Sequence, residues 1–185
     1  MPTGLAITAG LAGAVRLATG RADGLRAMET TLDGAARSFW AAAICLPPFL
    51  AMRLLGDDAP VTTQALLAEL VGYVIGWTAF PLLSRRMAIA GGRGARWPLF
   101  VAAWNWCNVI QYTTLILLTL ATAMGLPTSI ATVLGFVVLG YALWLGWFLT
   151  RHALAIDGFN AIGFVLIDVA TGILVSQIVT ALSKL

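Results

Sequence analysis

Residues 97–121 read WPLFVAAWNWCNVIQYTTLILLTLA, and this segment decides the fold. It exceeds the roughly 20 apolar residues that a transmembrane helix needs to cross a bilayer. Asn105, Asn108 and Gln111 nevertheless lie near its middle. Because side-chain amides need hydrogen-bond partners in lipid, we expect the helix to turn these residues towards protein.

The three amides share one side of the predicted helix with Trp104 and Tyr112, since a helix turns by about 100° per residue. Two interpretations of this polar side stay open. In the first, the amides hold the helix to its neighbours, at about 0.6 to 2 kcal/mol per hydrogen bond. In the second, they line a binding or conduction path, although no Lys, Arg or His joins them.

The composition is that of a membrane protein. Of the 185 residues, 60% are hydrophobic and only 10% are charged, and the mean hydropathy is +0.92, far from the balance in soluble domains. Five apolar segments are long enough to span a bilayer: 39–55, 62–83, 97–121, 128–150 and 159–182. The short connections leave room for one domain only. We therefore predict an all-α, polytopic membrane bundle with five transmembrane helices over residues 38–185.

Residues 1–37 are predicted to form a cytoplasmic, amphipathic region ahead of the first span. Apolar residues recur at helical spacing on both sides of a break at residues 20–24: Ile7, Leu11, Ala14 and Ala18, then Leu25, Met28, Leu32 and Ala35. We expect two short surface helices whose Arg side chains contact lipid phosphates. A sixth span through residues 4–19 is the alternative, but that segment is short for a span.

Glu69 and Asp168 are carboxylates inside predicted spans, where ionisable groups are rare and often functional. From a rise of about 1.5 Å per residue, Glu69 lies at the depth of Gln111 or Asn108, and Asp168 at the depth of Asn105 or Asn108. We predict an intramembrane polar core made of these five residues. Because no Lys or Arg is expected nearby, each carboxylate should be protonated or hydrogen-bonded rather than ion-paired.

Two pairs of small residues predict close helix packing, because small side chains let membrane helices approach one another. Gly72 and Gly76 form a GxxxG pair in the second span. Ala131 and Gly135 form a similar pair in the fourth span. We expect neighbouring helices to pack against both pairs.

The prolines, the cysteines and the single histidine suggest structural roles. Pro47 and Pro48 lie inside the first span and predict a kink or a broken turn there. Cys45 and Cys107 also lie inside spans and are predicted to be free thiols. His152 has no cluster of Cys, Asp or Glu around it, so the sequence predicts no metal site, and no cofactor motif is found.

The most basic connection of the chain carries Arg85, Arg86, Arg93 and Arg96, with glycines between them. It lacks the GxxxxGK[ST] pattern of a nucleotide site, so we interpret it as a cytoplasmic connector that contacts lipid or partner proteins. By alternation, nine of the 11 Lys and Arg fall on the side of this connection and the N-terminus. This bias predicts an integral protein of a bacterial inner membrane, with the N-terminus cytoplasmic and the C-terminus outside. The basic residues are spread over several loops, which argues against a nucleic-acid partner.

The chain resembles the Yip-domain family of small five-span membrane proteins. The resemblance rests on the five spans with short loops, the amphipathic N-terminal region, and the entry ARSFW at 36–40 into LPPF at 46–49. It covers most of the chain. It implies a non-enzymatic integral protein that organises membranes or other membrane proteins.

Two functions follow from these patterns. The first is a scaffold or accessory subunit that organises lipid or other membrane proteins, because packing pairs and an amphipathic region are present and no reactive cluster is found in the sequence. The second is a small oligomeric transporter or channel subunit that uses Glu69 or Asp168 as a protonatable site. Neither is an enzyme. The expected partners are membrane lipids and other membrane proteins or further copies of the chain.

Overall fold

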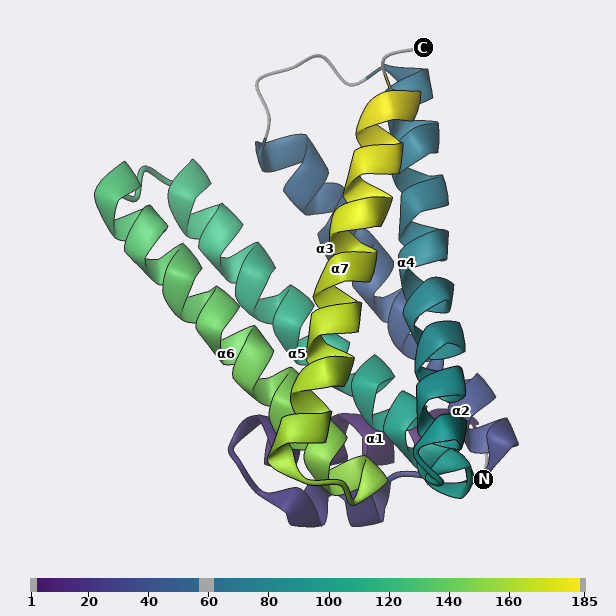
Figure 1. Cartoon of the computed structure of the whole chain (residues 1–185). Coiled ribbons are helices and arrows are strands. Elements are labelled where there is room, and N and C mark those ends of the chain that lie inside the picture. The colour runs from purple at the N-terminus through teal and green to yellow at the C-terminus, as the bar shows by residue number, and fades with distance from the viewer. Residues whose placement is uncertain (1–2, 57–61, 184–185) are drawn as a thin grey trace.

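Long helices form a bundle, and shorter helices lie across one end of it (Figure 1). This computed structural model describes residues 3–56 and 62–183, which form helices and turns and contain no strand. Five helices are long and apolar enough to cross a membrane, which confirms the predicted all-α bundle of an integral membrane protein. The elements are α1 (Thr3–Ala18), the 3-10 helix η1 (Ala22–Ala27), α2 (Leu32–Ser38), α3 (Trp40–Gly56), α4 (Thr63–Ala90), the 3-10 helix η2 (Gly94–Arg96), α5 (Trp97–Ala123), α6 (Thr128–Leu154) and α7 (Gly158–Leu182).

The five long helices begin and end close to the predicted positions. Only α4 differs by more than four residues at one end, because it continues seven residues beyond the predicted end at residue 83. The apolar run stops there, but Arg85 and Arg86 favour a helix as well as apolar residues do. α4 ends where Gly91 and Gly92 follow, and Gly92 has a positive φ of 68°, a conformation that favours glycine.

α3 stays helical through Pro47 and Pro48, so the turn is not broken there. Membrane helices tolerate proline where neighbouring groups bond to the backbone. The Tyr73 hydroxyl of α4 donates to the Ala42 carbonyl at 2.6 Å, one residue before Ala43 and Ile44, whose carbonyls lose their helical donors to the two prolines. This contact also ties α4 to α3.

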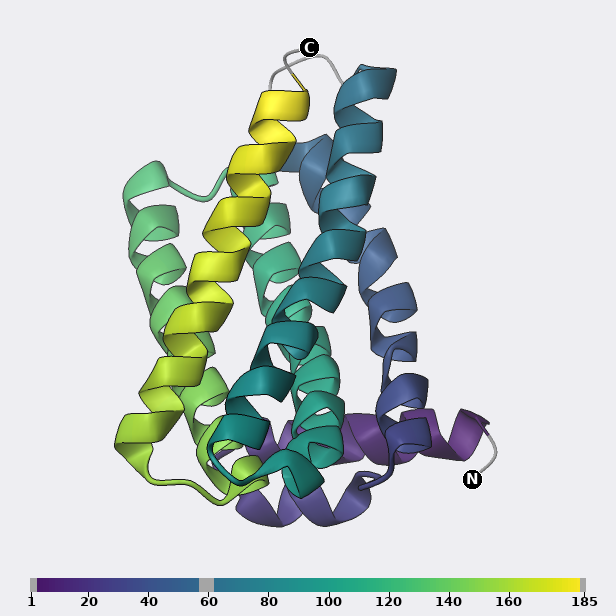
Figure 2. The same ribbon diagram turned by 45° about the vertical axis from the view of Figure 1, so that its right-hand side comes forward.

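α1 lies across the end of the bundle that also holds the α4–α5 and α6–α7 connections (Figure 2). A Cβ added to Gly10 would meet the Trp106 ring of α5 at 2.3 Å, so the glycine allows a very close approach. At the C-terminal end of α1, the Tyr141 hydroxyl of α6 donates to the Ala18 carbonyl at 2.9 Å. The apolar face of α1 therefore packs on the bundle, where Ala14 and Leu17 are fully buried.

The second predicted surface helix is instead two elements, η1 and α2. The chain is extended at Met28 and Thr31, which separates Leu25 from the exposed Leu32. Thr31 starts α2, because its hydroxyl oxygen accepts a hydrogen bond from the Gly34 amide at 3.1 Å, as N-capping residues do. A single helix over residues 25–35 was therefore the wrong expectation.

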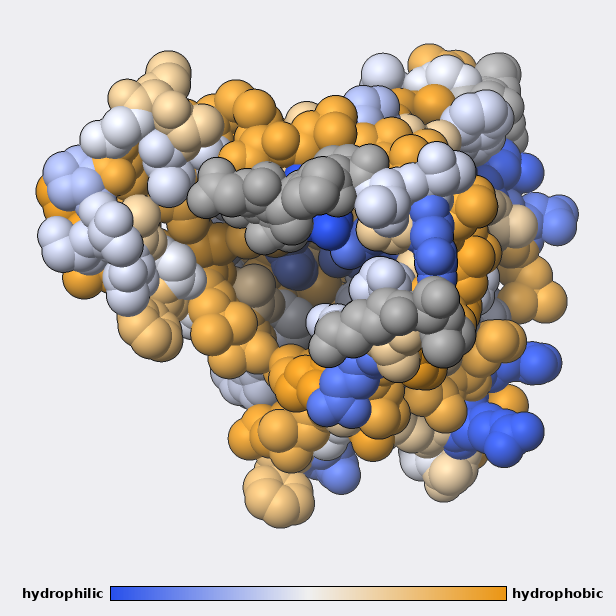
Figure 3. Space-filling view, turned by 90° about the horizontal axis from the view of Figure 1, so that it is seen from above, coloured by the Kyte–Doolittle hydropathy of each residue, from blue (hydrophilic) through white to orange (hydrophobic). Residues whose placement is uncertain are grey.

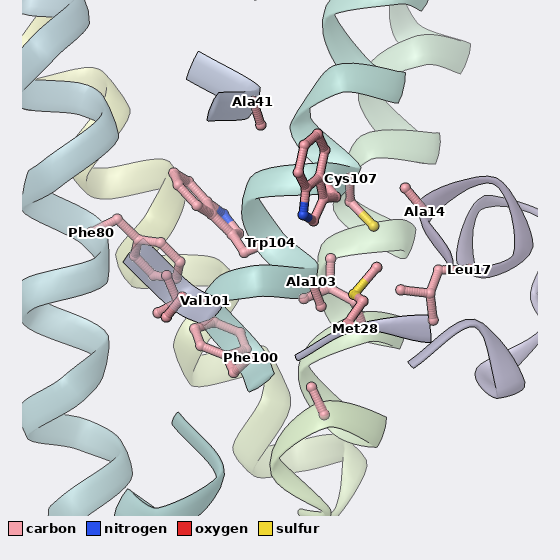
Figure 4. Close-up of a cluster of buried hydrophobic side chains, with 14 of the residues drawn as sticks. Ala14, Leu17, Met28, Ala41, Phe80, Phe100, Val101, Ala103, Trp104 and Cys107 are labelled. Carbon is pink, nitrogen blue, oxygen red and sulfur yellow. The ribbon is translucent and has the colours of Figure 1, made fainter. Parts of the chain in front are cut away.

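The first half of α5 is the centre of the core (Figure 4). All residues from Phe100 to Cys107 are buried, because α1, α2, α3 and α6 surround this half of the helix. Cys45 and Cys107 are buried free thiols, as predicted. From Asn108 onwards α5 is less buried, and the α5–α6 hairpin leans away from α4 and α7 (Figure 1).

Candidate functional site: an acidic, aromatic cavity between the helices

A cavity of about 380 Å³ lies between α4, α5 and α7, with one residue of α3 at its edge. Five aromatic side chains line it: Phe49, Tyr73, Trp77, Trp104 and Tyr112. Its polar residues are Glu69, Asn108, Asp168, Ser176 and Thr180. Seen from the end opposite α1, the molecule is hollowed between the α5–α6 tip and the other helices, and hydrophilic groups lie inside the hollow (Figure 3). The volume falls in the range of about 300 to 1,000 Å³ that is typical of small-molecule sites.

The aromatic side chains form one connected wall. Trp77 stacks on Tyr112, with ring centroids 6.4 Å apart and planes at 20°. Trp104 meets Trp77 edge-on at 5.8 Å, and Tyr73 packs on Phe49 at 4.7 Å. Such pairs restrain one another, since each adds about 0.5 to 1.5 kcal/mol beyond the burial of area. The cavity therefore has walls that are held in place on three of its four helices.

Asp168 is the acidic residue of α7 in this cavity. Its Oδ2 accepts a hydrogen bond from Trp104 Nε1 at 3.0 Å. Among the described residues, no Lys, Arg or His nitrogen lies within 4.0 Å of the carboxylate. The carboxylate is hydrogen-bonded rather than ion-paired, as predicted, but the donor is Trp104 and neither Asn105 nor Asn108. Asn108 lines the same cavity.

Glu69 forms an ion pair, so the prediction that it would not was wrong. Its Oε1 lies 3.2 Å from Nε of Arg53, with both side chains about three-quarters buried (22% and 25% exposed). Arg53 is in the last turn of α3 and Glu69 in the second turn of α4, so both lie near the same end of the bundle. The long Arg stem can follow an apolar surface while its guanidinium reaches a partner. The sequence signal was the presence of Arg53 inside the apolar run 39–55.

The remaining amides of the predicted polar core lie elsewhere. Asn105 is fully buried and donates through Nδ2 to the Ser38 hydroxyl at 2.7 Å, where α2 meets α3. Gln111 lines a separate cavity of about 160 Å³ between α5 and α6. Of the five residues predicted to form a polar core, Glu69, Asn108 and Asp168 share the 380 Å³ cavity, which is called the main cavity below because of its polar lining. A larger, more apolar cavity of about 430 Å³ lies beside Phe159 and Phe164 at the start of α7.

The residues of the two predicted small-residue pairs differ in how closely they are packed. A Cβ on Gly72 would lie 2.2 Å from Val179 of α7, which confirms a close helix approach there. A Cβ added to Gly76 or to Gly135 would have no atom of the described residues within 4 Å. These two glycines are therefore not closely packed against another helix. Gly76 opens onto the main cavity, and Gly135 onto the cavity that holds Gln111. Ala131 is partly exposed on α6.

Two of the four arginines predicted to form a basic surface instead contact other parts of the protein. Arg96 donates through Nε to the Ala153 carbonyl at 2.7 Å and through Nη2 to the His152 carbonyl at 3.2 Å. These carbonyls end α6, so Arg96 acts as a side-chain cap. The Arg85 guanidinium lies 5.7 Å from the centre of the Trp97 ring. Arg86 and Arg93 are exposed.

The Arg96 contacts predict a stability effect that its neighbour lacks. Replacing Arg96 with Gln should lower the free energy of unfolding by about 1 kcal/mol, because two helix-terminal carbonyls lose a charged donor. The matched change Arg86→Gln removes the same charge from an exposed position and should have little effect. Denaturant unfolding in detergent micelles measures both values. Equal losses from the two variants would show that Arg96 contributes only charge.

The fold and the cavity define a polytopic, all-α integral membrane protein with an acidic, aromatic site between its helices. Comparisons of the chain with protein-family models, curated proteins and solved structures found no match. The resemblance to the Yip-domain family therefore stays a prediction that rests on layout and one short stretch.

Proposed function

We propose that the protein is a non-enzymatic subunit of a small oligomeric transporter that exchanges protons through its main cavity, with Asp168 as the protonatable group. The observation that carries this proposal is the setting of Asp168. Its carboxylate lines a cavity between membrane helices and has no cationic partner within 4.0 Å among the described residues. A carboxylate in that setting can bind and release a proton as pH or a bound solute changes.

Glu69 is less suited to this role. Its carboxylate is already held in an ion pair by the guanidinium of Arg53, 3.2 Å away. Removing the proton from Asp168 meets no such fixed partner. These contacts therefore favour Asp168 over Glu69 as the proton-binding group.

In this proposal, α1 and the basic connections face the cytoplasm at a bacterial inner membrane. The support for this orientation is the excess of Arg at the end of the bundle that holds α1 and the α4–α5 connection. Glu69 and Thr180 of the cavity lie towards the opposite end, near the start of α4 and the end of α7. Protons would then enter the cavity from the outside.

Reconstitution tests the proposal directly. The purified chain is placed in liposomes that contain a pH-sensitive dye, and a pH step is imposed with and without a membrane potential. We expect proton entry well above that of protein-free liposomes. The absence of flux under both conditions, with correctly folded protein, would refute the proposal.

A second candidate, a scaffold or accessory subunit, is favoured by Gln111. Its side-chain amide has no hydrogen-bond partner among the described residues, and the nearby Gly135 has open space beside it. An unpaired amide in lipid calls for a polar group from another helix. Cross-linking from a cysteine at position 111 in native membranes would identify such a helix, and its absence would count against this candidate.

A further inference from the structure

The two carboxylates of the main cavity differ in their partners. Glu69 is paired with Arg53 near the rim. Asp168 has no such partner among the described residues, and its Oδ1 accepts no hydrogen bond from them. An ionised Asp168 therefore leaves one negative charge in a low-dielectric site, where the binding of a cation is strongly favoured.

The aromatic wall suits a particular kind of cation. The faces of Trp and Tyr rings attract positive charge that lies within about 6 Å, and this attraction grows when the cation is desolvated. Trp77, Trp104 and Tyr112 line the cavity together with Asp168. An inorganic ion would need several oxygen ligands in fixed positions, whereas the polar groups here are few and spread over three helices.

Two glycines leave open space in the cavity that Asp168 lines. Gly172 is one helical turn beyond Asp168 on α7, and Gly76 lies on α4. Both line the cavity, and within the described part of the chain neither has any atom within 4 Å of the place a Cβ would occupy. The cavity therefore has room for apolar substituents of a ligand at these two positions.

We infer that the cavity binds a small organic cation, with a quaternary or substituted ammonium group near Asp168 and apolar substituents against the aromatic wall. This inference rests on the proposed exchange at Asp168, because the cation and the proton would use the same carboxylate. Of the residues that the structure describes, the other titratable groups that line the cavity are Glu69 and Tyr73 of α4 and Tyr112 of α5, and α3 contributes Phe49 to the lining.

Benzyltrimethylammonium is a suitable probe, because it combines a quaternary ammonium group with one aromatic ring. Binding of the radiolabelled ion to the full-length protein in nanodiscs is measured by scintillation proximity, with protein-free nanodiscs as background. We expect saturable binding that unlabelled benzyltrimethylammonium displaces. Benzylsulfonate, a similar molecule of opposite charge, should not displace it.

Two variants separate charge from shape. Asp168→Asn should weaken binding at least tenfold, while Asp33→Asn, an equal change of charge at an exposed residue of α2, should not. Gly172→Leu should fill the cavity and also weaken binding at least tenfold, with Gly140→Leu as its control. Gly140 likewise has open space around it but does not line the cavity. Circular dichroism and gel filtration identify any variant that is misfolded.

The outcomes are distinct. Binding that survives both Asp168→Asn and Gly172→Leu, or that benzylsulfonate displaces, would overturn the inference. Proton flux that depends on Asp168 without any binding of the probe would refute the cation site and leave the exchange function standing. Binding of the probe without proton release or flux would support the cation site and refute proton exchange.

Discussion

Replacing Asp168 with Asn is expected to lower proton flux into proteoliposomes at least tenfold, to the level of protein-free vesicles. The amide of Asn has no proton to exchange at ordinary pH. Its oxygen can still accept the hydrogen bond that Trp104 donates to Asp168, so the variant should fold. The measurement is the rate of fluorescence change of an enclosed pH dye after an imposed pH step.

Two further variants make this result specific. Asp33→Asn removes a carboxylate from an exposed position on α2 and should leave the flux unchanged. Glu69→Gln tests the choice between the two carboxylates of the cavity. A larger loss of flux from Glu69→Gln than from Asp168→Asn would transfer the proton-binding role to Glu69.

The second large effect concerns the contact between α4 and α7. Gly72→Ala should destabilise the protein by about 1 to 3 kcal/mol, because an added methyl group in a closely packed site forces the helices apart. The Cβ would lie only 2.2 Å from Val179 Cγ2. Unfolding by sodium dodecyl sulfate in mixed micelles measures the change in free energy.

Gly76→Ala is the matched control, four residues further along the same helix. The added methyl group would enter open space, and Ala is the better helix former by up to about 1 kcal/mol. Its effect should therefore be neutral or slightly stabilising. Equal destabilisation by both variants would mean that the cost lies in the helix itself rather than in its contact with α7.

The number of long helices and most of their ends could be predicted because bilayer thickness fixes how long an apolar run must be. Gly125, with a φ of 96°, and Pro127 lie in the turn between α5 and α6 and limit these two helices. The end of α4 could not be predicted in this way, because hydropathy does not report a helix that continues into charged residues. The break between η1 and α2 depends on a single cap at Thr31, which periodicity alone does not show.

The partners of the polar residues were harder to predict than their positions. Depth along a helix follows from residue number, and it correctly brought Asn108 and Asp168 into one cavity. The rotation and tilt of each helix do not follow from residue number, and they decide that Asn105 meets Ser38 and that Gln111 faces α6. Residue number also does not show how far a long side chain extends, so Arg53 was not predicted as the partner of Glu69.

The docking of α1 sets an order of events during synthesis. Ala18 and its partner Tyr141 are 123 residues apart in the chain, and Gly10 contacts Trp106 of α5. At roughly 5 to 20 residues per second, the ribosome needs about 6 to 25 seconds to make the intervening chain. α1 can contact η1 and α2 early, but its contacts with α5 and α6 form only after those helices have been made, so its docking on the bundle is a late step of assembly.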